Sequence, residues 1–516
     1  MPASTLPPTT TTPTTTRPAA PVRGTSSAVA PGLAPWAPVA ASSPATSARR
    51  ARGRLRHALA IGVALAFAGG VPRDARAEDD LVAAARAGRF EQVEALLVAG
   101  RAADPTSPGY SALMWAAERG DVAMARRLLR AGADPAWHDH NGEFALGWAA
   151  REGRVATVRV LLDAGTKVDE LDRWGRSALF AAAGAGHVEV VEELLARGAD
   201  ARRADVWGEA VLFPACQSGR TEVVRRLLAA GADAKVVRPH RKATPLHVAA
   251  ERGDAALVDA LVAAGAAVDA LDEQEEAPLH AAARAGNDAA TAALLAHGAD
   301  PDGGGKAKST PFELAVGREG DAVAPRLVER TRATGRALVA AAAAARPALV
   351  VQLVARVGVP LPAAEGGEAL VAGARGGDVD VLRALLDAKA SLERAGAAAL
   401  VTAAGAGRDA AVALLLERGV AADARAADGT TAFVAAVESG WVDVAERLRA
   451  RGADVKALDA SGRGARARLD ARIEEVAARV AEGERHRGIP AWLEPTRAYL
   501  ERLRATRAAL APHLDR

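Results

Sequence analysis

The sequence has few aromatic residues and almost no cysteine. Aromatic side chains make up 3% of the 516 residues, although half of all residues are hydrophobic. A single large core needs bulky side chains to fill it, so this composition argues against one compact globule. Alanine dominates instead, and it suits many short helix pairs because it costs least in a helix and lets helices approach closely. The only cysteine, Cys216, excludes an intrachain disulfide and is interpreted as a small buried residue.

Acidic residues are missing from the start of the chain. Residues 1–48 contain no Asp or Glu and are rich in Pro, Thr, Ala and Ser, which predicts a disordered leader. Residues 49–77 then carry a basic stretch, RRARGRLRH, an apolar run from Ala58 to Gly70, and an A-x-A motif that ends at Ala77. These are the parts of a signal peptide, so we expect cleavage after Ala77 and a periplasmic or secreted protein.

Two other interpretations of this segment stay open. The apolar run is shorter than a comfortable membrane span, so we expect no stable span once the leader is removed. A membrane anchor through residues 58–70 is the first alternative, and an organellar transit segment, which is also poor in acids, is the second.

Long clusters of one charge are absent from the rest of the chain. The formal net charge is +3, but residues 1–77 alone contribute +8, because they contain nine Arg residues and a single acid. The remainder is slightly acidic and shows no basic cluster, so nucleic acid is not an expected partner.

Motifs for catalysis, cofactors and metals are also missing. Neither Gly-x-Ser-x-Gly nor His-Glu-x-x-His occurs, and no paired-carboxylate site is apparent. The stretch GGGKAK, residues 303–308, lacks the Ser or Thr that follows the lysine of a phosphate-binding loop. We therefore expect no enzyme activity, no catalytic residues, no cofactor and no metal site.

What the sequence does have is a repeat. The stretch TPLHVAAERGD, from Thr244 to Asp254, returns in related form as APLHAAARAGN, SALMWAAERGD and SALFAAAGAGH. A glycine ends each copy at 88, 120, 153, 186, 219, 253, 286 and 320, and the series resumes at 377, 407 and 440 after a weak copy around Ala345. Each unit of about 33 residues predicts a short helix, a glycine turn, a second helix and a loop with GAD and a D-x-x-G turn.

This repeat resembles the ankyrin repeat over about residues 78–463. The segments that carry the resemblance are the TPLH copies, Thr244-Pro245-Leu246-His247 and Pro278-Leu279-His280, and the recurrent Gly-Ala-Asp loops at Gly132, Gly198, Gly231, Gly298 and Gly452. The resemblance implies an all-α repeat solenoid: stacked ankyrin helix-turn-helix units with short hairpin loops. Each unit is incomplete alone, because its apolar face is buried only by its neighbour.

The motif residues have structural roles in this interpretation. Thr244 caps the helix, Pro245 lies in the first turn where its missing N–H costs nothing, and Leu246 enters the core. The resemblance implies that His247 and His280 form hydrogen bonds within and between neighbouring loops.

The array divides into two blocks, residues 78–330 and residues 335–463. We expect Pro325 to break the second helix of its unit and to leave a kink or hinge between the blocks. Residues 464–516 carry apolar residues at helical spacing and predict a C-terminal helical hairpin that caps the stack. The rival interpretation is a hairpin for docking or oligomerisation, and the oligomeric state stays open.

The function that follows is a non-enzymatic scaffold that binds a protein partner through the concave face of the first block. Trp174 and Trp207 are predicted to stand side by side at successive loop tips and to contact a partner, and Trp137 lies on the preceding loop. Trp115 and Trp148 are interpreted as packing residues, with recognition as the alternative. The polar pairs at the family's recognition positions are also candidates, although a plain solvated face would explain them too: Glu118 and Arg119, Arg151 and Glu152, Glu251 and Arg252.

Two alternative functions remain at this level. The first is an exported ligand sensor or enzyme whose cryptic site is assembled from distant units. The second is a cytoplasmic or membrane-anchored ankyrin regulator.

Overall fold

The computed structural model describes residues 80–105, 109–303, 309–318, 322–484 and 493–514. The chain separates into two units, residues 1–72 and residues 73–516, and every described residue belongs to the second. The predicted leader and signal-like segment lie outside the described residues. Within the described part there are 26 helices, five isolated β-bridges and no strand, so the predicted all-α repeat solenoid is confirmed.

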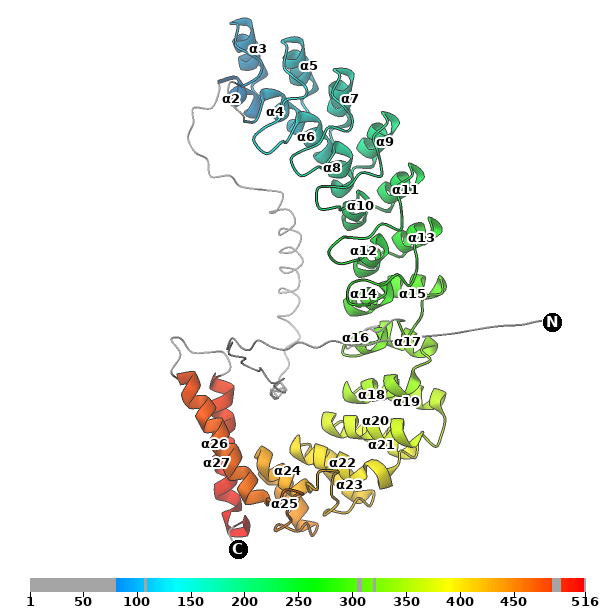
Figure 1. The fold of residues 1–516 in the computed structure, drawn as a ribbon, viewed down its shortest axis with the longest axis vertical. Coiled ribbons are helices and arrows are strands. Elements are labelled where there is room, and N and C mark those ends of the chain that lie inside the picture. The colour runs from blue at the N-terminus through cyan, green and yellow to red at the C-terminus, as the bar shows by residue number, and fades with distance from the viewer. Residues whose placement is uncertain (1–79, 106–108, 304–308, 319–321, 485–492, 515–516) are drawn as a thin grey trace, which may run out of the picture. The chain divides into compact units, whose positions relative to one another are not determined.

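The helices form two layers, with the even-numbered helices on one side and the odd-numbered helices on the other (Figure 1). We call them the inner and the outer layer. The inner helices are α2 (Asp80–Arg86), α4 (Ala112–Arg119), α6 (Ala145–Arg151), α8 (Ala178–Ala185), α10 (Leu212–Ser218), α12 (Pro245–Arg252), α14 (Pro278–Ala285), α16 (Pro311–Ala315), α18 (Thr334–Ala343), α20 (Ala363–Gly376), α22 (Leu392–Gly405) and α24 (Ala432–Ser439).

Each outer helix follows its inner helix and packs against it. The outer helices are α3 (Phe90–Val98), α5 (Val122–Arg130), α7 (Val155–Asp163), α9 (Val188–Ala196), α11 (Thr221–Ala229), α13 (Ala255–Ala263), α15 (Asp288–Ala296), α17 (Val323–Arg330), α19 (Pro347–Val357), α21 (Val379–Asp387), α23 (Asp409–Glu417) and α25 (Val442–Ala450). Inner helices contact inner helices and outer helices contact outer helices along the row, and the buried Leu, Val and Ala side chains form one continuous core.

The inner helices begin and end at residues suited to these positions. The Ser111 hydroxyl accepts the Met114 N–H at 3.2 Å, which satisfies a backbone donor that the first turn leaves free. The helix then ends at Gly120, whose φ of 77° is a left-handed conformation that favours glycine.

A donor side chain from the next unit seals most of these helix ends. Arg154 Nε donates to the Glu118 carbonyl oxygen at 3.1 Å, and a Cβ on Gly120 would lie 2.7 Å from Arg154 Cδ. The turn glycine is therefore needed twice, for its backbone angle and for the space above it. The same contact recurs with other donors: Arg119 to Arg86 O, Arg252 to Gln217 O, Asn287 to Ala250 O, Arg408 to Arg375 O and Trp441 to Gly405 O.

Units of two kinds make up the array. In the hairpin units, which include α6 to α15, the inner helices have 7 or 8 residues and follow a projecting hairpin such as the one closed by the bridge between Leu171 and Ser177. In the extended-helix units, α20 to α23, the inner helices have 14 residues and no such bridge precedes them. There the inner helix begins earlier and takes the place of the hairpin.

The prediction that Pro325 breaks its helix is wrong. Helix α17 begins at Val323, so Pro325 is its third residue and lies in the first turn, where a missing N–H leaves no hydrogen bond unmade. The connection to the second block is also tied to the first, because the Asp302 carboxylate accepts the Arg332 N–H at 2.9 Å. Helix α16 contacts α18, and α17 contacts α19, so the layers continue across this connection.

Two longer helices, α26 (Ala465–Glu484) and α27 (Leu493–Leu514), follow the last repeat. Helix α26 packs on α24, and α27 contacts both α24 and α25. Arg502 of α27 lies 4.0 Å from the centre of the Trp441 ring and donates to the Ser439 carbonyl oxygen at 3.3 Å. It thus makes at the end of α24 the contact that a following unit makes elsewhere in the stack.

Candidate protein-binding surface

Three aromatic residues cluster on the inner layer at α4 and α6. The Tyr110 ring lies 5.4 Å from Trp115 and 5.6 Å from Trp148, with the second pair edge to face. Trp115 and Trp148 occupy the same position in successive inner helices, and both are partly exposed while packing on the core. Sequence reasoning missed Tyr110, although it precedes the Ser111 N-cap directly and aligns with Glu143 of the next unit. We call Tyr110, Trp115 and Trp148 the aromatic cluster.

Arginine side chains lie over the faces of the cluster. The Arg151 guanidinium carbon lies 3.6 Å from the centre of the Trp148 ring, and that of Arg86 lies 5.5 Å from the Trp115 ring. A cation over an indole face is attracted by the ring's negative quadrupole. Arg151 also pairs with Glu143, at 3.3 Å between Nη1 and Oε1. The rings and their charged neighbours are therefore held in place before any partner arrives.

The indole nitrogens of the cluster are unsatisfied donors. Among the described residues, Trp115 Nε1 and Trp148 Nε1 are buried and have no hydrogen-bond partner. Leaving such a group unpaired costs about 1–3 kcal/mol, so a native structure rarely holds two of them together without a reason.

The electrostatic environment of the cluster disfavours further negative charge. Burial raises the pKa of the Glu118 carboxyl, and the neighbouring Glu152 carboxylate raises it further. Burial also raises the pKa of Glu143, against the opposing effect of Arg151. For the Tyr110 hydroxyl, burial and nearby carboxylates raise the pKa to about 12, so it stays a neutral donor at all ordinary pH values.

Some residues of the predicted polar pairs form hydrogen bonds within the stack, whereas others lie at the aromatic cluster or are exposed. Arg119 and Arg252 donate to carbonyl oxygens of the preceding unit, at 3.4 Å to Arg86 O and 2.5 Å to Gln217 O, so their guanidinium groups hold the stack together. Arg151 stacks on the Trp148 ring of the aromatic cluster, and the Glu152 carboxylate lies 4.0 Å from Arg151 Nε. Glu251 is exposed on the inner layer next to Arg252.

The tryptophans of the loops lie in different environments. Trp137 is partly buried, and its Nε1 donates to the Gly109 carbonyl oxygen at 3.0 Å, so it fastens its loop to the preceding unit. Trp174 lies between two guanidinium groups, those of Arg173 at 4.4 Å and Arg176 at 4.3 Å. Trp207 is 55% exposed, the highest exposure of any described tryptophan.

The hairpin tips of four successive units form a continuous edge of the inner layer. Counting the hairpin closed by the bridge between His138 and Phe144 as tip 1, we number these four tip 2 (residues 172–176), tip 3 (205–209), tip 4 (238–242) and tip 5 (272–276). The Val206 N–H donates to Trp174 O at 2.8 Å between tips 2 and 3, and the Glu273 N–H donates to Arg241 O at 2.9 Å between tips 4 and 5. Arg238 of tip 4 pairs with Glu209 of tip 3 at 2.7 Å. Backbone and side-chain bonds thus fix the tips relative to one another.

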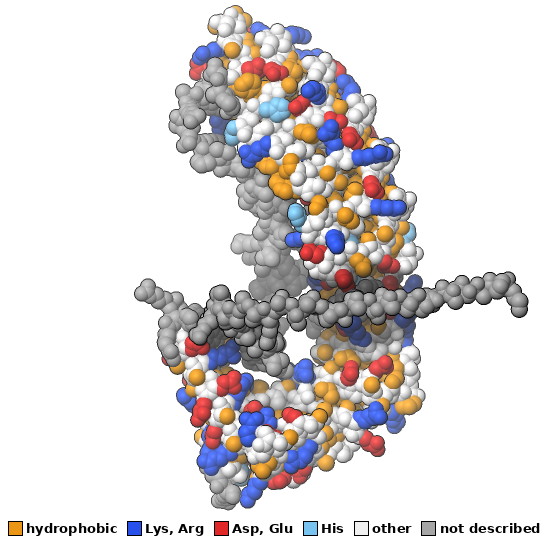
Figure 2. Space-filling model, viewed as in Figure 1, with side chains coloured by type: hydrophobic (Ala, Val, Ile, Leu, Met, Phe, Trp, Pro, Cys, Tyr) orange, Lys and Arg blue, Asp and Glu red, His pale blue; other side chains and the backbone are white. Residues whose placement is uncertain are grey.

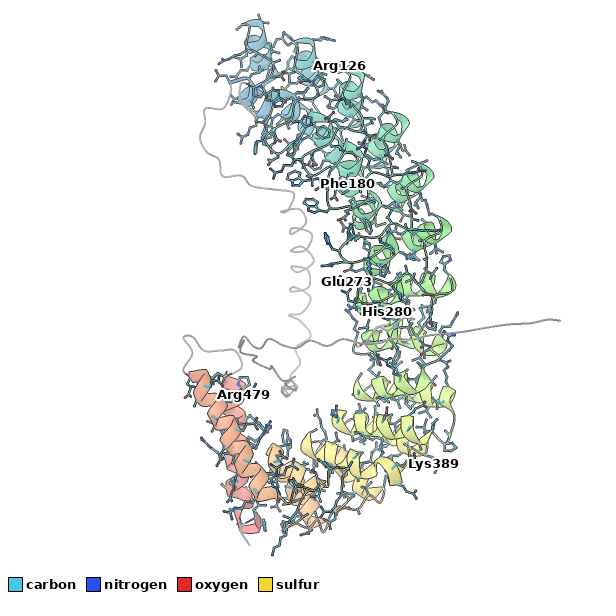
Figure 3. The ribbon with its side chains drawn as sticks, in the orientation of Figure 1. Arg126, Phe180, Glu273, His280, Lys389 and Arg479 are labelled. Carbon is cyan, nitrogen blue, oxygen red and sulfur yellow. The ribbon has the colours of Figure 1, made fainter. Side chains whose placement is uncertain are left out.

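The two histidines of the TPLH copies, His247 and His280, form hydrogen bonds with backbone groups of the neighbouring loops. The Thr244 N–H donates to His247 Nδ1 at 3.1 Å, and His247 Nε2 lies 3.0 Å from Glu276 O in the next tip. His280, labelled in Figure 3, accepts the Ala277 N–H at Nδ1 over 3.0 Å. Both imidazoles are buried, which lowers their pKa. Pro245, Leu246, Pro278 and Leu279 are buried in the first turns of α12 and α14.

Charges of both signs are interspersed over the face shown in Figure 2, without a large area of one sign. Within the described ranges, no group of three His, Cys, Asp or Glu side chains could hold a metal ion. In the same residues, no helix combines the length and hydropathy that crossing a bilayer requires. Cys216 is buried, and burial raises the pKa of its thiol to about 12.

Comparison with known proteins identifies the repeat. A family model described as ankyrin repeats (3 copies) matches residues 81–172, 164–238, 226–305 and 369–459, together more than half of the chain. Among solved structures, the human ASB11 ankyrin repeat domain is similar, with 28% sequence identity and a TM-score of 0.40. That match covers 43% of this chain and 98% of the ASB11 domain. No match was found among curated proteins. The chain belongs to the ankyrin-repeat family.

Proposed function

We propose that the protein is a non-enzymatic scaffold that binds a protein partner through the inner layer of its first block, residues 78–330. The aromatic cluster carries this proposal: three preorganised and partly exposed rings stand together on the inner layer. Tryptophan and tyrosine contribute most strongly to interface cores, because they bury a large area at a small cost in conformational entropy.

The neighbouring unit offers space beside the cluster. Helix α8 has Ala181, Gly184 and Ala185 on its accessible side, where α4 and α6 have tryptophans and charged residues. The change from large to small side chains along this face leaves a depression beside the cluster, which a protruding side chain of a partner can fill. The arginines over the indole rings give the same region polar contacts that would hold the partner in register.

A binding screen with the full-length chain tests this function. Peptides selected from a displayed random library are measured against the parent and against Trp115→Ala/Trp148→Ala, with Trp174→Ala/Trp207→Ala in parallel. We expect at least one of the two variants to lose tenfold or more in affinity, about 1.4 kcal/mol, because truncating a buried aromatic anchor costs that much or more.

The control is Trp441→Phe, which keeps the packing and removes one hydrogen bond in the second block, outside the proposed surface. Each variant is first checked for parental helix content and cooperative unfolding. Unchanged binding by both double variants would refute the proposed surface.

Export of a bacterial protein is the second part of the proposal. The basic stretch, the apolar run and the A-x-A motif within residues 49–77 support it. N-terminal sequencing of the protein recovered from the producing cells tests it directly. We expect the chain to begin at Glu78 and to fractionate outside the cytoplasm, and a chain that keeps residues 49–77 in the cytoplasm would contradict export.

A further inference from the structure

The hairpin tips of the first block carry charges that the protein itself does not neutralise. Outer-layer arginines elsewhere pair across units, as Arg127 does with Glu94 at 2.6 Å and Arg197 with Asp163 at 2.9 Å. On the tips, Arg173, Arg241 and Lys242 are exposed, and no described carboxylate lies within ion-pair distance of them. Three bases on the edge formed by tips 2 to 4 are thus available to a partner.

Apolar side chains lie exposed among these bases. Val206 and Trp207 of tip 3 are 61% and 55% exposed, and Val237 at the base of tip 4 is 52% exposed. A loop that only connected two helices would have no need of such side chains at its end. Together with the bases, they form an edge that is apolar in the middle and positive on both sides.

Tip 5 has the opposite charge. It contains Asp272, Glu273, Glu275 and Glu276, and Glu276 forms an ion pair with Arg284. Figure 3 shows Glu273 on the side of the inner layer. Because the Glu273 N–H bonds to Arg241 O, the acidic tip lies directly beside the basic one. Charge therefore changes sign at a fixed point along the edge.

Two charged residues of the tips occupy backbone positions that disfavour a side chain. In tips 2 and 3 the left-handed residue is glycine, Gly175 with φ 75° and Gly208 with φ 77°. In tips 4 and 5 it is Lys242 with φ 51° and Glu275 with φ 60°. A side chain in this conformation costs about 1 kcal/mol or more relative to glycine, and such strain is typically found at functional sites.

We propose that tips 2 to 5 are the docking surface for an extended polypeptide segment of mixed charge. Its acidic residues face Arg173, Arg241 and Lys242, an apolar side chain covers Val206 and Trp207, and a basic residue faces Glu273. This surface rests on the proposed function and adds to it the chemistry of the partner.

Charge complementarity singles out a polypeptide. A nucleic acid would bring phosphates along its whole length, and the carboxylates of tip 5 would repel them where the bases of tip 4 attract them. A polypeptide can change sign over a few residues, so it can match both tips at once. Trp207 then supplies the apolar anchor at the centre.

The test is selection from a displayed library of short random peptides on the full-length chain. We expect the enriched peptides to carry an aromatic or branched aliphatic residue, acidic residues on both sides of it and a basic residue at one end. Arg241→Glu/Lys242→Glu should weaken them about tenfold or more, and replacing the acidic residues next to the basic end of a selected peptide by lysines should restore its binding to that variant.

The matched control is Arg126→Glu/Lys389→Glu. It makes the same change of charge at two exposed residues that Figure 3 shows on the outer side of the stack. We expect it to leave affinity within about twofold of the parent, because surface charges separated by more than a Debye length are largely screened.

Three outcomes would overturn the inference. These are enriched peptides without an acidic bias, an equal loss with the control variant, or tighter binding of a single-stranded oligonucleotide than of any selected peptide. If selected peptides tolerate the Arg241 and Lys242 reversal but fail on Trp115→Ala/Trp148→Ala, the proposed function stands and this surface falls. If no peptide is enriched, or the binders map to the outer helices, both fall.

Discussion

Hairpin units and extended-helix units stack in the same two layers but begin their inner helices differently. Helix α12 has 8 residues and follows a hairpin, whereas α20 has 14 residues and follows a short loop. Both end at a left-handed glycine, Gly253 and Gly377, and both receive a donor from the next unit, Asn287 and Arg408. Stacking therefore depends on the apolar spacing and the sealed helix end, and it does not require the hairpin.

The inner surfaces of the two kinds of unit differ accordingly. The first block carries the aromatic cluster and the charged tips, whereas the inner side of α18, α20 and α22 is lined mainly by Ala, Gly and Val around a groove of about 520 Å³. The proposed recognition by large aromatic side chains is therefore confined to the first block. The second block therefore lacks both the TPLH motif and the surface of aromatic side chains and charged tips that is found in the first block.

The largest expected effect comes from filling a close helix contact in an extended-helix unit. Gly373 of α20 takes the position that Ala249 has in α12, counted back from the turn glycine, and a Cβ there would lie 3.0 Å from Val381 Cγ1 of α21. Gly373→Leu should lower the free energy of unfolding by about 3 kcal/mol through overpacking. Urea denaturation measures this loss. Ala372→Leu, on the partly exposed side of the same helix, is the control and should change it by less than about 0.5 kcal/mol.

The adjacent residues Gly376 and Gly377 allow the energetic effect of backbone angle to be measured apart from that of helix propensity. Gly377 has φ 84°, and a Cβ would meet Arg408 Cδ at 2.5 Å, whereas Gly376 is helical and its nearest atom would be Ala342 O at 3.7 Å. Gly377→Ala should cost about 2 kcal/mol, and Gly376→Ala should be neutral or stabilise by up to about 1 kcal/mol. Thermal unfolding of the two variants compares them. Equal losses would show that the helix end is not sealed in this way.

Mild acid should weaken the hairpin units selectively. Burial lowers the pKa of His247 and His280, and each Nδ1 accepts a backbone N–H that a protonated ring could not accept. The unfolded chain, with an ordinary pKa near 6.5, then binds more protons than the folded one. Stability is therefore fully present above about pH 6.5 and falls as the pH drops below it.

Hydrogen exchange in peptides from α12 and α14, corrected for the intrinsic rate, measures this loss. The extended-helix units contain no histidine and should keep their protection over the same range. His247→Gln/His280→Gln should abolish the difference in pH dependence between the two kinds of unit. An equal acid sensitivity of α20 and α22 would contradict the assignment to these two residues.

The smallest expected effect is a gain. Ala345 has φ 53° at the place of a turn glycine, and an alanine in this conformation costs about 1 kcal/mol. Ala345→Gly should therefore raise the free energy of unfolding by about 0.5–1 kcal/mol, less the entropy that glycine adds to the unfolded chain. Ala341→Gly, inside α18, serves as the opposite control and should destabilise the protein.

The repeat period of the sequence predicted the helix pairs well, because the period is set by the glycines that the helix ends require. Gly120, Gly186 and Gly253 are all required at their positions by backbone angle and contact, so their spacing gives the unit length directly. The extended helices could not be predicted in the same way, since they replace a loop motif by ordinary helix-forming residues. Pro325 was misjudged because the start of α17 is set by tertiary packing and has no side-chain cap.

The binding surface was only partly visible in the sequence. The spacing of Trp174 and Trp207 places them on successive tips, but nothing in the sequence shows that Arg173 and Arg176 enclose the first while the second is exposed. Tyr110 was missed because it joins Trp115 and Trp148 only when two units stack. Arg119 and Arg252 look like recognition residues by position, yet their donors are bound within the stack.

The most direct test of the central claim is site-specific photocrosslinking in the cells that make the protein. A photoreactive phenylalanine analogue is placed at Trp148 or Trp207 on the inner side, and at Arg126 or Lys389 on the outer side. The account predicts a covalent adduct with another protein at one or both inner positions and none at the outer pair. Adducts only at the outer positions, or at none of the four, would contradict it.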